Sequence, residues 1–230
     1  MAGSRRIEEL QFGPVETSAR LVDTIVEKLR DAILGGELLP GTALSVPALA
    51  RALDVSRSPV REAVLQLVGD GLAVEQPRKG VVVATIDHED LVRIHEIREY
   101  MEAAAARYCA ERIDRSGIAA LDAVLIRQKQ AVAGHDARTY YETNAELHAL
   151  IAGNSNNPPL ALMLSRFEGQ MAIALQQISS SPAHMREAFQ EHEEIVAQIR
   201  SGNSDKAEQA MRLHIAGTLA RVKQMHEDGD

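Results

Sequence analysis

The chain has 230 residues and a formal net charge of −8, so it is long enough for one large domain or two modest ones. Its one cysteine, Cys109, excludes an internal disulfide and a cysteine-based zinc finger, and no apolar run reaches the roughly 20 residues of a membrane span. Aromatic residues make up only 3% of the chain, so Ala, Leu, Val and Ile must fill the core, which favours helices packed on helices. We therefore expect a mostly α-helical, cytoplasmic protein.

The negative charge is concentrated in the second part of the chain. Residues 1–86 are almost neutral, and residues 87–230 carry nearly all of the excess acid. The first residues, 1–17, mix Gly, Pro, Ser and charged side chains without periodicity, which predicts a flexible arm. An acidic balance argues against nonspecific binding to polyanions, but residues 18–86 still have room for a short, focused DNA-reading surface.

Three helices and a hairpin are predicted in residues 18–86. Apolar residues recur at helical spacing from Leu21 onward, a short helix follows Ser45, and another begins after Ser56 and stops near Gly71. The apolar face of that third helix is predicted to comprise Val60, Val64, Leu65 and Val68. The β-rich stretches "LAVEQ" and "VVVAT", joined by "PRKG", then predict a two-stranded hairpin. This order of elements is typical of a winged helix-turn-helix DNA-binding domain.

Cationic side chains gather where a winged helix would meet DNA. Arg57 and Arg61 lie one turn apart at the start of the third helix, and Arg78 and Lys79 lie at the tip of the wing. Each of them alone is consistent with an ordinary surface charge. The four together favour DNA, because guanidinium groups match guanine edges and phosphates. The full set of predicted DNA contacts is Arg51, Ser56, Arg57, Ser58, Arg61, Arg78, Lys79 and Gly80.

From residue 87 to the end, every segment is predicted to be helical. The expected spans are 87–112, 116–133, 136–153, 158–179, 183–201 and 204–226. The breaks between them are rich in Gly, Asn, Ser and Pro, which are typical of turns. We therefore expect residues 87–230 to form an all-helical domain with a core of its own.

Three of the eight histidines occupy apolar helical stripes. His148, His192 and His214 each fall on the inward face of a different predicted helix. One such histidine is usually a satisfied core residue, whereas three partly satisfied imidazoles in one bundle would be costly to bury. A divalent metal held from facing helices would satisfy them together, and imidazoles suit zinc or nickel. The remaining histidines are predicted to be surface residues: His88, His95, His135, His184 and His226.

Several stretches resemble the GntR family of bacterial transcription regulators. The segments "KLRDAILGGELLPGTAL", "LARALDVSRSPVREAVLQLVGDGLAV" and "PRKGVVVA" resemble its DNA-binding domain. The segments "EIREYMEAAAARYCA", "NAELHALI", "EHEEIVAQI" and "AMRLHI" resemble the helical effector domain of the FadR branch, the FCD type. The resemblance implies a homodimer that binds a two-fold DNA operator and senses a small molecule with its second domain.

The resemblance also implies a set of effector-site residues. Many members hold a divalent metal with an Asp, a His four residues later and two further His, and here Asn144 takes the place of the Asp. Because an amide oxygen is a weaker ligand than a carboxylate, partial metal occupancy is expected. Arg98 lies on an inward stripe. Its role is either structural, as a buried ion-pair partner or a contact at a domain boundary, or functional, as a clamp for a carboxylate effector, the role of similar arginines in family members. Another departure precedes the second helix, where Val46 and Pro47 replace the usual Glu and a DNA-contacting basic residue.

The leading hypothesis is a ligand-responsive DNA-binding transcription regulator, a repressor released from its operator by a small carboxylate effector bound near the metal. One alternative keeps the DNA binding but makes the helical domain a metal-free sensor of acyl groups or organic acids. The other is a metal-dependent enzyme in which the three histidines hold an ion that activates water. No well-placed general base accompanies the histidines, and catalysis would leave the winged helix unexplained, so we do not expect an enzyme.

Overall fold

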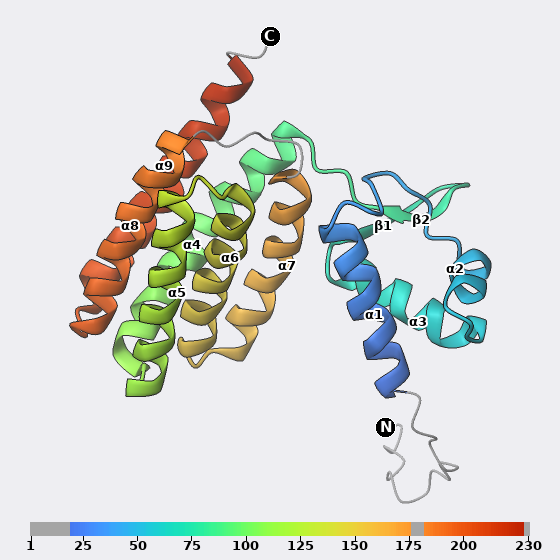
Figure 1. Ribbon diagram of the computed structural model, residues 1–230, viewed down its shortest axis with the longest axis horizontal. Helices are drawn as coiled ribbons and strands as arrows, with labels where there is room; N and C mark the ends of the chain where they lie inside the picture. The colour runs from blue at the N-terminus through green and yellow to red at the C-terminus, as the bar shows by residue number, and fades with distance from the viewer. Residues whose placement is uncertain (1–18, 176–181, 228–230) are drawn as a thin grey trace, which may run out of the picture.

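The computed structural model describes residues 19–175 and 182–227, and its elements form two groups (Figure 1). The first group consists of α1 (Ala19–Leu34), α2 (Val46–Ala52), α3 (Arg57–Gly69), β1 (Ala73–Gln76) and β2 (Gly80–Val83). The second group consists of α4 (His88–Arg112), α5 (Arg115–Ala133), α6 (Ala137–Asn154), α7 (Pro158–Leu175), α8 (Pro182–Arg200) and α9 (Ser204–Glu227). The arm predicted for residues 1–17 lies outside the described residues. Within those residues, no helix is long and apolar enough to cross a membrane.

The first group is a winged helix whose helices share one apolar core. Ile25 and Ile33 of α1 and Val60 and Leu67 of α3 are all buried in this core. The prediction that Leu65 belongs to the buried face of α3 was wrong, because its side chain is 49% exposed. Five residues turn a helix by roughly 500°, so Leu65 points about 140° away from Val60. The buried residues of α3 are instead Pro59, Val60, Ala63, Val64 and Leu67.

The predicted hairpin forms the wing. Its strands β1 and β2 pair antiparallel, with Ala73 opposite Val83. At its tip, Arg78 and Gly80 have positive φ angles of 68° and 77°, a conformation that glycine adopts without steric cost. The turn leaves the side chains of Arg78 and Lys79 exposed at the end of the wing.

Aspartate caps determine where three helices of the bundle begin. Asp87, Asp114 and Asp136 each accept a hydrogen bond from the backbone N–H three residues later, which satisfies one free donor of α4, α5 and α6. All six bundle helices start within one residue of the predicted positions. The predicted end of the fourth span at residue 179 lies outside the described residues.

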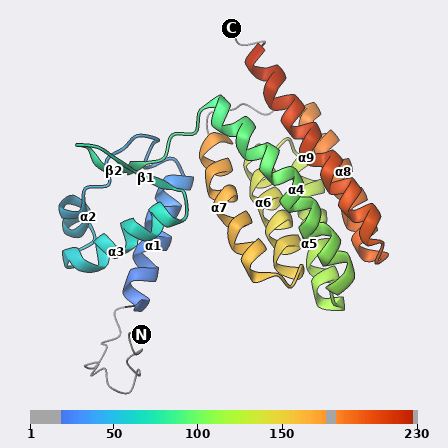
Figure 2. The ribbon, with the colours of Figure 1, turned by 180° about the vertical axis from the view of Figure 1, so that it is seen from behind.

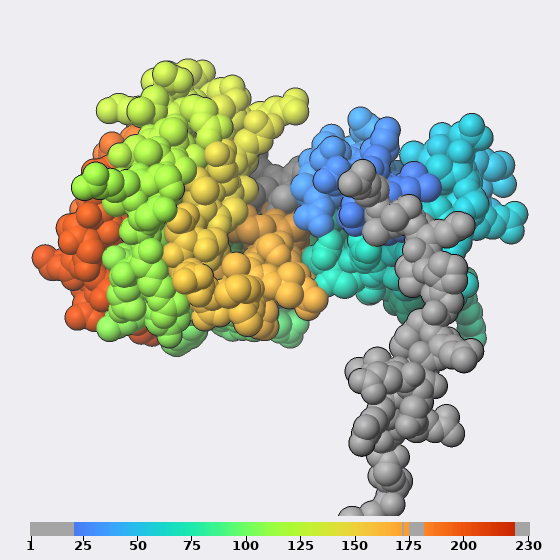
Figure 3. Space-filling model, turned by 90° about the horizontal axis from the view of Figure 1, so that it is seen from below, coloured from blue at the N-terminus to red at the C-terminus, as the bar shows by residue number. Residues whose placement is uncertain are grey.

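Helix α7 connects the bundle to the winged helix. Within the bundle, α4 runs alongside α9 and also contacts α6, α7 and α8 (Figure 2). On the side that faces the winged helix, α7 contacts α1 (Figures 1 and 3). The side chain of Ile173 on α7 is fully buried in the winged-helix core. A Cβ atom on Gly169 would lie only 2.9 Å from Cδ2 of Leu72, so glycine permits this close approach.

Candidate functional site

The predicted DNA contacts lie on the exposed side of α3 and the wing. Arg57, Ser58 and Arg61 line a surface hollow that Pro47 of α2 and Glu75 of β1 also border. The same segment begins with Ser56 as the N-cap of α3, and the Ser56 side chain makes no capping hydrogen bond. The side chains of Arg51, Arg78 and Lys79 and the backbone of Gly80 are exposed outside this hollow.

These cations are free of intramolecular ion pairs. Among the residues that the structure describes, Arg57, Arg61 and Lys79 have no acidic partner, and neither have Arg51 and Arg78. Several arginines of the bundle, in contrast, are bound to carboxylates, including Arg107, Arg127, Arg200 and Arg212. The positive charges of the winged helix are therefore available to an external polyanion, even though the chain as a whole is acidic.

The second candidate site is a histidine cluster inside the bundle. His148 of α6, His192 of α8 and His214 of α9 are buried, and one nitrogen from each ring lies within 4.8 Å of the other two. The Nε2 atoms of His192 and His214 are 3.2 Å apart. Three helices distant in sequence thus bring the three predicted ligands together around one point.

The outer nitrogen of each ring faces a hydrogen-bond acceptor. The three pairs are His148 Nδ1 with Glu102 at 2.6 Å, His192 Nδ1 with the Gln128 amide oxygen at 2.9 Å, and His214 Nδ1 with Glu191 at 2.6 Å. With these oxygens as acceptors, a neutral ring carries its proton on Nδ1 and leaves the Nε2 lone pair for the centre of the cluster. Two such lone pairs 3.2 Å apart repel each other unless a cation lies between them. Nitrogens bound to one zinc ion lie roughly 3–3.5 Å apart, so the cluster fits a divalent metal.

The electrostatics also favour metal binding by two of the three imidazoles. Burial, reinforced by the neighbouring histidines, holds the pKa of His192 well below its usual value, and burial lowers the pKa of His214 as well. Both rings are therefore neutral at pH 7 and keep a lone pair for a metal. Burial alone would lower the pKa of His148, but the Glu102 carboxylate outweighs burial and raises it. A raised pKa means that His148 holds its second proton more firmly, so a metal that binds this ring has to displace that proton.

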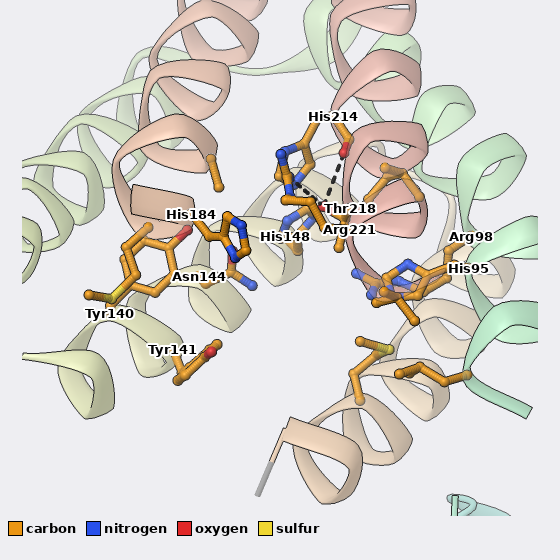
Figure 4. A pocket seen from close by; sticks show the side chains of 16 residues that line it. His95, Arg98, Tyr140, Tyr141, Asn144, His148, His184, His214, Thr218 and Arg221 are labelled. Carbon is orange, nitrogen blue, oxygen red and sulfur yellow. Dashed lines mark hydrogen bonds between the residues drawn. The ribbon is translucent and has the colours of Figure 1, made fainter. Parts of the chain in front are cut away.

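A cavity of about 130 Å³ lies beside the cluster (Figure 4). Its lining includes His148 and His214, together with Asn144, one helical turn before His148 on α6. The structure therefore places the predicted amide ligand at the same cavity as two of the histidines. Apolar side chains such as Met171 and Ile215 form much of the remaining wall.

Arg98 of α4 is part of a buried ion-pair network. Its guanidinium lies 2.5 Å from Glu102 and 3.1 Å from Glu168 of α7. The buried ion pair was one of the two roles predicted for this arginine. Arg98 also lines the cavity, so its guanidinium lies beside any ligand that fills it. Through Glu102, the same network holds the ring of His148.

Two histidines that were predicted to lie at the surface line the cavity instead. His95 is 1% exposed, and His184 is half-buried. The prediction failed for His95 because α4 contacts four other helices, so its buried face is wider than one stripe and includes Leu91, His95, Arg98 and Glu102. His135 is exposed and His88 half-buried, whereas the side chain of His226 lies outside the described residues.

Sequence reasoning missed the three acceptors that orient the histidines. Gln128 interrupts the apolar stripe of Leu121 and Val124 in the same way as the histidines interrupt theirs, so the same pattern could have identified it. Glu102 follows Arg98 by four residues on an inward face, which is a recognisable ion-pair spacing. Glu191 precedes His192 directly, and nothing in the sequence indicates that it binds a histidine of another helix.

Comparison with known proteins identifies the family. The family model described as bacterial regulatory proteins, gntR family, matches residues 21–83, and the FCD domain model matches residues 93–217. The chain belongs to the GntR family. It is 26% identical over 224 residues to the galactonate operon transcriptional repressor of Escherichia coli K12, and this alignment covers 88% of this chain and 97% of the relative. It is also 25% identical over 204 residues to the uncharacterised HTH-type transcriptional regulator YdhC of Bacillus subtilis 168, over 88% of this chain and 91% of the relative.

Solved structures show the same fold. This GntR-family chain aligns with McbR/YncC of E. coli at a TM-score of 0.76 and 24% identity, over 90% of this chain and 98% of the other. A GntR regulator of Rhodococcus sp. RHA1 aligns at a TM-score of 0.74 and 22% identity, over 90% and 99% of the two chains. The two family models and the curated relatives together make the protein a DNA-binding transcription regulator with an N-terminal winged helix and a C-terminal FCD domain.

Proposed function

We propose that this GntR-family regulator is a metal-assisted repressor that leaves its operator when a small carboxylate binds in the FCD cavity. The observation that carries the proposal is the pair of Nε2 atoms 3.2 Å apart in a buried cluster whose Nδ1 atoms all face acceptors. A divalent ion held by His148, His192 and His214, with Asn144 at the cavity side, accounts for this arrangement. Zinc or nickel suits such nitrogen donors, and either ion supplies positive charge that attracts an anion.

The effector class follows from the charges around the cavity. Arg98 and Arg221 line the cavity, but both are already paired, Arg98 with Glu102 and Glu168 and Arg221 with Glu191. Without a metal, a further anion therefore finds no free arginine there. A bound divalent ion would supply positive charge beside the cavity and attract one carboxylate. Metal and effector should therefore strengthen each other's binding by the same factor. Because Arg98 is already bonded to two carboxylates, it lines the effector cavity but is not free to clamp the effector.

In this proposal, the exposed cations of the winged helix contact the operator DNA. Arg57 and Arg61 at the start of α3 read bases and phosphates in the major groove, and Arg78 and Lys79 contact the backbone through the wing. Ser56, Ser58 and Arg51 supply further phosphate contacts, and Gly80 shapes the wing tip.

A homodimer on a two-fold operator completes the proposal, because two recognition helices must reach successive turns of the major groove. Ile97 and Tyr100 on α4 and Leu213 on α9 are more than half exposed, and the contact of Arg212 with Glu99 joins the two helices at this level. These exposed apolar side chains on two adjoining helices make this side of the bundle our candidate for the subunit interface. Light scattering should give a dimer for the wild type and a shift toward the 25.1 kDa monomer for Leu213→Glu.

The metal-free sensor is the competing function, and one observation favours it. If the Gln128 amide is reversed, its NH₂ group donates to His192, which can donate through Nε2 to His214, which donates to Glu191. That chain of hydrogen bonds satisfies the cluster without a metal. The two functions differ in whether the histidines bind a cation.

Calorimetric titration of zinc into metal-free protein separates them. We expect wild type to bind one equivalent per chain, Asn144→Asp to bind more tightly, and a His192→Ala/His214→Ala variant to lose binding. Operator binding by all three proteins, measured by fluorescence anisotropy, controls for folding. Equally poor zinc binding by all three would eliminate the metal and leave the metal-free sensor.

A further inference from the structure

Two polar groups at the cavity have no hydrogen-bond partner among the described residues. Both ring nitrogens of His95 and the hydroxyl of Tyr141 are buried and unpaired. Both side chains line the cavity that also contains Asn144, His148 and His214. In the view of Figure 4, His95 and Tyr141 lie on opposite sides of the cavity, with His148 between them. Buried polar groups are usually paired, so a group left unpaired at a cavity indicates a missing partner.

The chemistry of His95 restricts what that partner is. Burial lowers the pKa of His95 to about 3, and the nearby Arg98 acts in the same direction, so the ring is neutral at pH 7. A neutral imidazole has one N–H donor and one nitrogen acceptor. A carboxylate only accepts hydrogen bonds and would leave the acceptor nitrogen of His95 unpaired. A hydroxyl group both donates and accepts, so it can form a hydrogen bond with either nitrogen of this ring.

Charge leads to the same class of ligand group. The guanidinium of Arg98 lines the cavity together with His95, but it is already bonded to the carboxylates of Glu102 and Glu168. A second carboxylate of the ligand would therefore find no free cation at this end of the cavity, whereas an uncharged hydroxyl group needs none. The cavity of about 130 Å³ holds roughly ten water-sized groups, which matches a small acid of three to six carbons.

We propose that His95 is a specificity-determining contact of the effector site and selects acids that carry a hydroxyl group, with Tyr141 meeting a second polar group of longer ligands. The inference rests on the proposed function, because it assumes that a carboxylate occupies the metal side of the cavity. A hydroxyl group of the ligand then forms a hydrogen bond with His95, and in longer ligands a second polar group forms one with Tyr141.

Matched acids that differ in their hydroxyl groups test the proposal. 3-Hydroxybutyrate against butyrate, lactate against propionate, and gluconate against hexanoate are titrated calorimetrically into zinc-loaded, full-length protein. For the pair that contains the better ligand, the hydroxylated acid should bind wild type at least about tenfold more tightly than its partner, since the loss of one buried hydrogen bond leaves His95 unpaired. His95→Phe keeps the ring but removes both nitrogens, and should reduce this ratio to less than about threefold.

Conservative and control variants separate a specific contact from a structural effect. His95→Gln retains a donor and an acceptor and should keep part of the discrimination, while His135→Gln at an exposed site should leave it unchanged. Tyr141→Phe should weaken gluconate more than lactate. Zinc affinity and operator affinity should stay at the wild-type level in every variant, which shows that the fold and the metal site are intact; if His95→Phe does not fold, His95→Gln and Tyr141→Phe carry the test.

The outcomes are distinct. An unchanged ratio in His95→Phe, with normal zinc and operator binding, overturns the proposal and makes His95 an unpaired core residue. If none of the six acids binds zinc-loaded wild type, the carboxylate effector of the proposed function fails, and the role of His95 fails with it. A collapse of the ratio in His95→Phe but not in His135→Gln supports the assignment.

Discussion

Glu168 and Ile173 lie on the same helix, α7, and face different parts of the molecule. Glu168 is 3.1 Å from Arg98 in the ion-pair network beside the histidine cluster. Ile173, five residues later, is fully buried in the core of the winged helix. A shift of α7 that began at the ion pair would move a residue on which the DNA-binding unit packs, so under the proposed function we expect α7 to link effector binding to the operator.

Replacing Ile173 should weaken this coupling. Ile173→Ala removes a fully buried side chain and should cost about 2–5 kcal/mol of unfolding free energy in the winged helix. We expect effector affinity to change little, while the effector-induced loss of operator affinity becomes smaller. Anisotropy titrations of labelled operator with and without effector measure the coupling. Ile199→Ala, which opens a comparable cavity inside the bundle, should keep the coupling of the wild type, and equal coupling in both variants would argue against α7 as the link.

Arg61 should contribute to sequence-specific DNA binding. Arg61→Ala should weaken binding to the specific operator by about 1–3 kcal/mol and weaken binding to unrelated DNA much less, because a base contact is lost. The measurement is anisotropy with both DNA sequences at one salt concentration. Arg186→Ala, an exposed arginine of the bundle, is the matched control and should change neither affinity. An Arg57→Ala/Arg61→Ala protein with undiminished operator affinity would refute the assignment.

Lys79 should act through charge alone. Lys79→Ala should weaken specific and nonspecific binding by similar factors and reduce the slope of log affinity against log salt by about 1, since one phosphate contact is lost. Titrations between low and moderate salt give this slope directly. A loss confined to the specific operator would instead make Lys79 a base contact.

Gln128 should tune metal affinity although it cannot reach the metal. Gln128→Leu removes the acceptor of the His192 Nδ1–H and should lower zinc affinity by about 10–100-fold, because the ring loses its fixed orientation. Zinc affinity is measured by competition with a chelator. Gln130→Leu, on the exposed side of the same helix, should bind zinc as the wild type does.

Metal-free protein should lose stability in mild acid. The pKa of His95 falls from 6.5 to about 3 on folding, mainly through burial. Between these two values the unfolded chain binds a proton at His95 and the folded chain does not, so acid favours unfolding. The free energy of unfolding therefore has its full value above pH 6.5 and declines steadily down to about pH 3. At pH 5 the share of His95 alone is about 2 kcal/mol. Urea unfolding should show a smaller difference in the free energy of unfolding between pH 7 and pH 5 for His95→Phe than for wild type. Identical differences would contradict the lowered pKa of His95.

Periodicity predicts the helices well because apolar spacing and capping residues act locally. Asp87 and Gly71, for example, mark helix boundaries that the structure reproduces. The convergence of His148, His192 and His214 could also be anticipated from their stripes. Their acceptors were missed because they depend on which helices face each other, and that pairing is set by the packing of the whole bundle. His95 was misassigned for the same reason, since its burial depends on the several helices that surround α4.

The uneven distribution of charge described above also governs how this regulator searches a genome. The exposed arginines of the winged helix attract phosphates over a short range, while the acidic bundle behind them repels the same polyanion. We therefore expect productive encounters to be those in which the wing and α3 approach the DNA first. We also expect weak binding to random sequence and fast dissociation from it, because few exposed cations are available to contact phosphates.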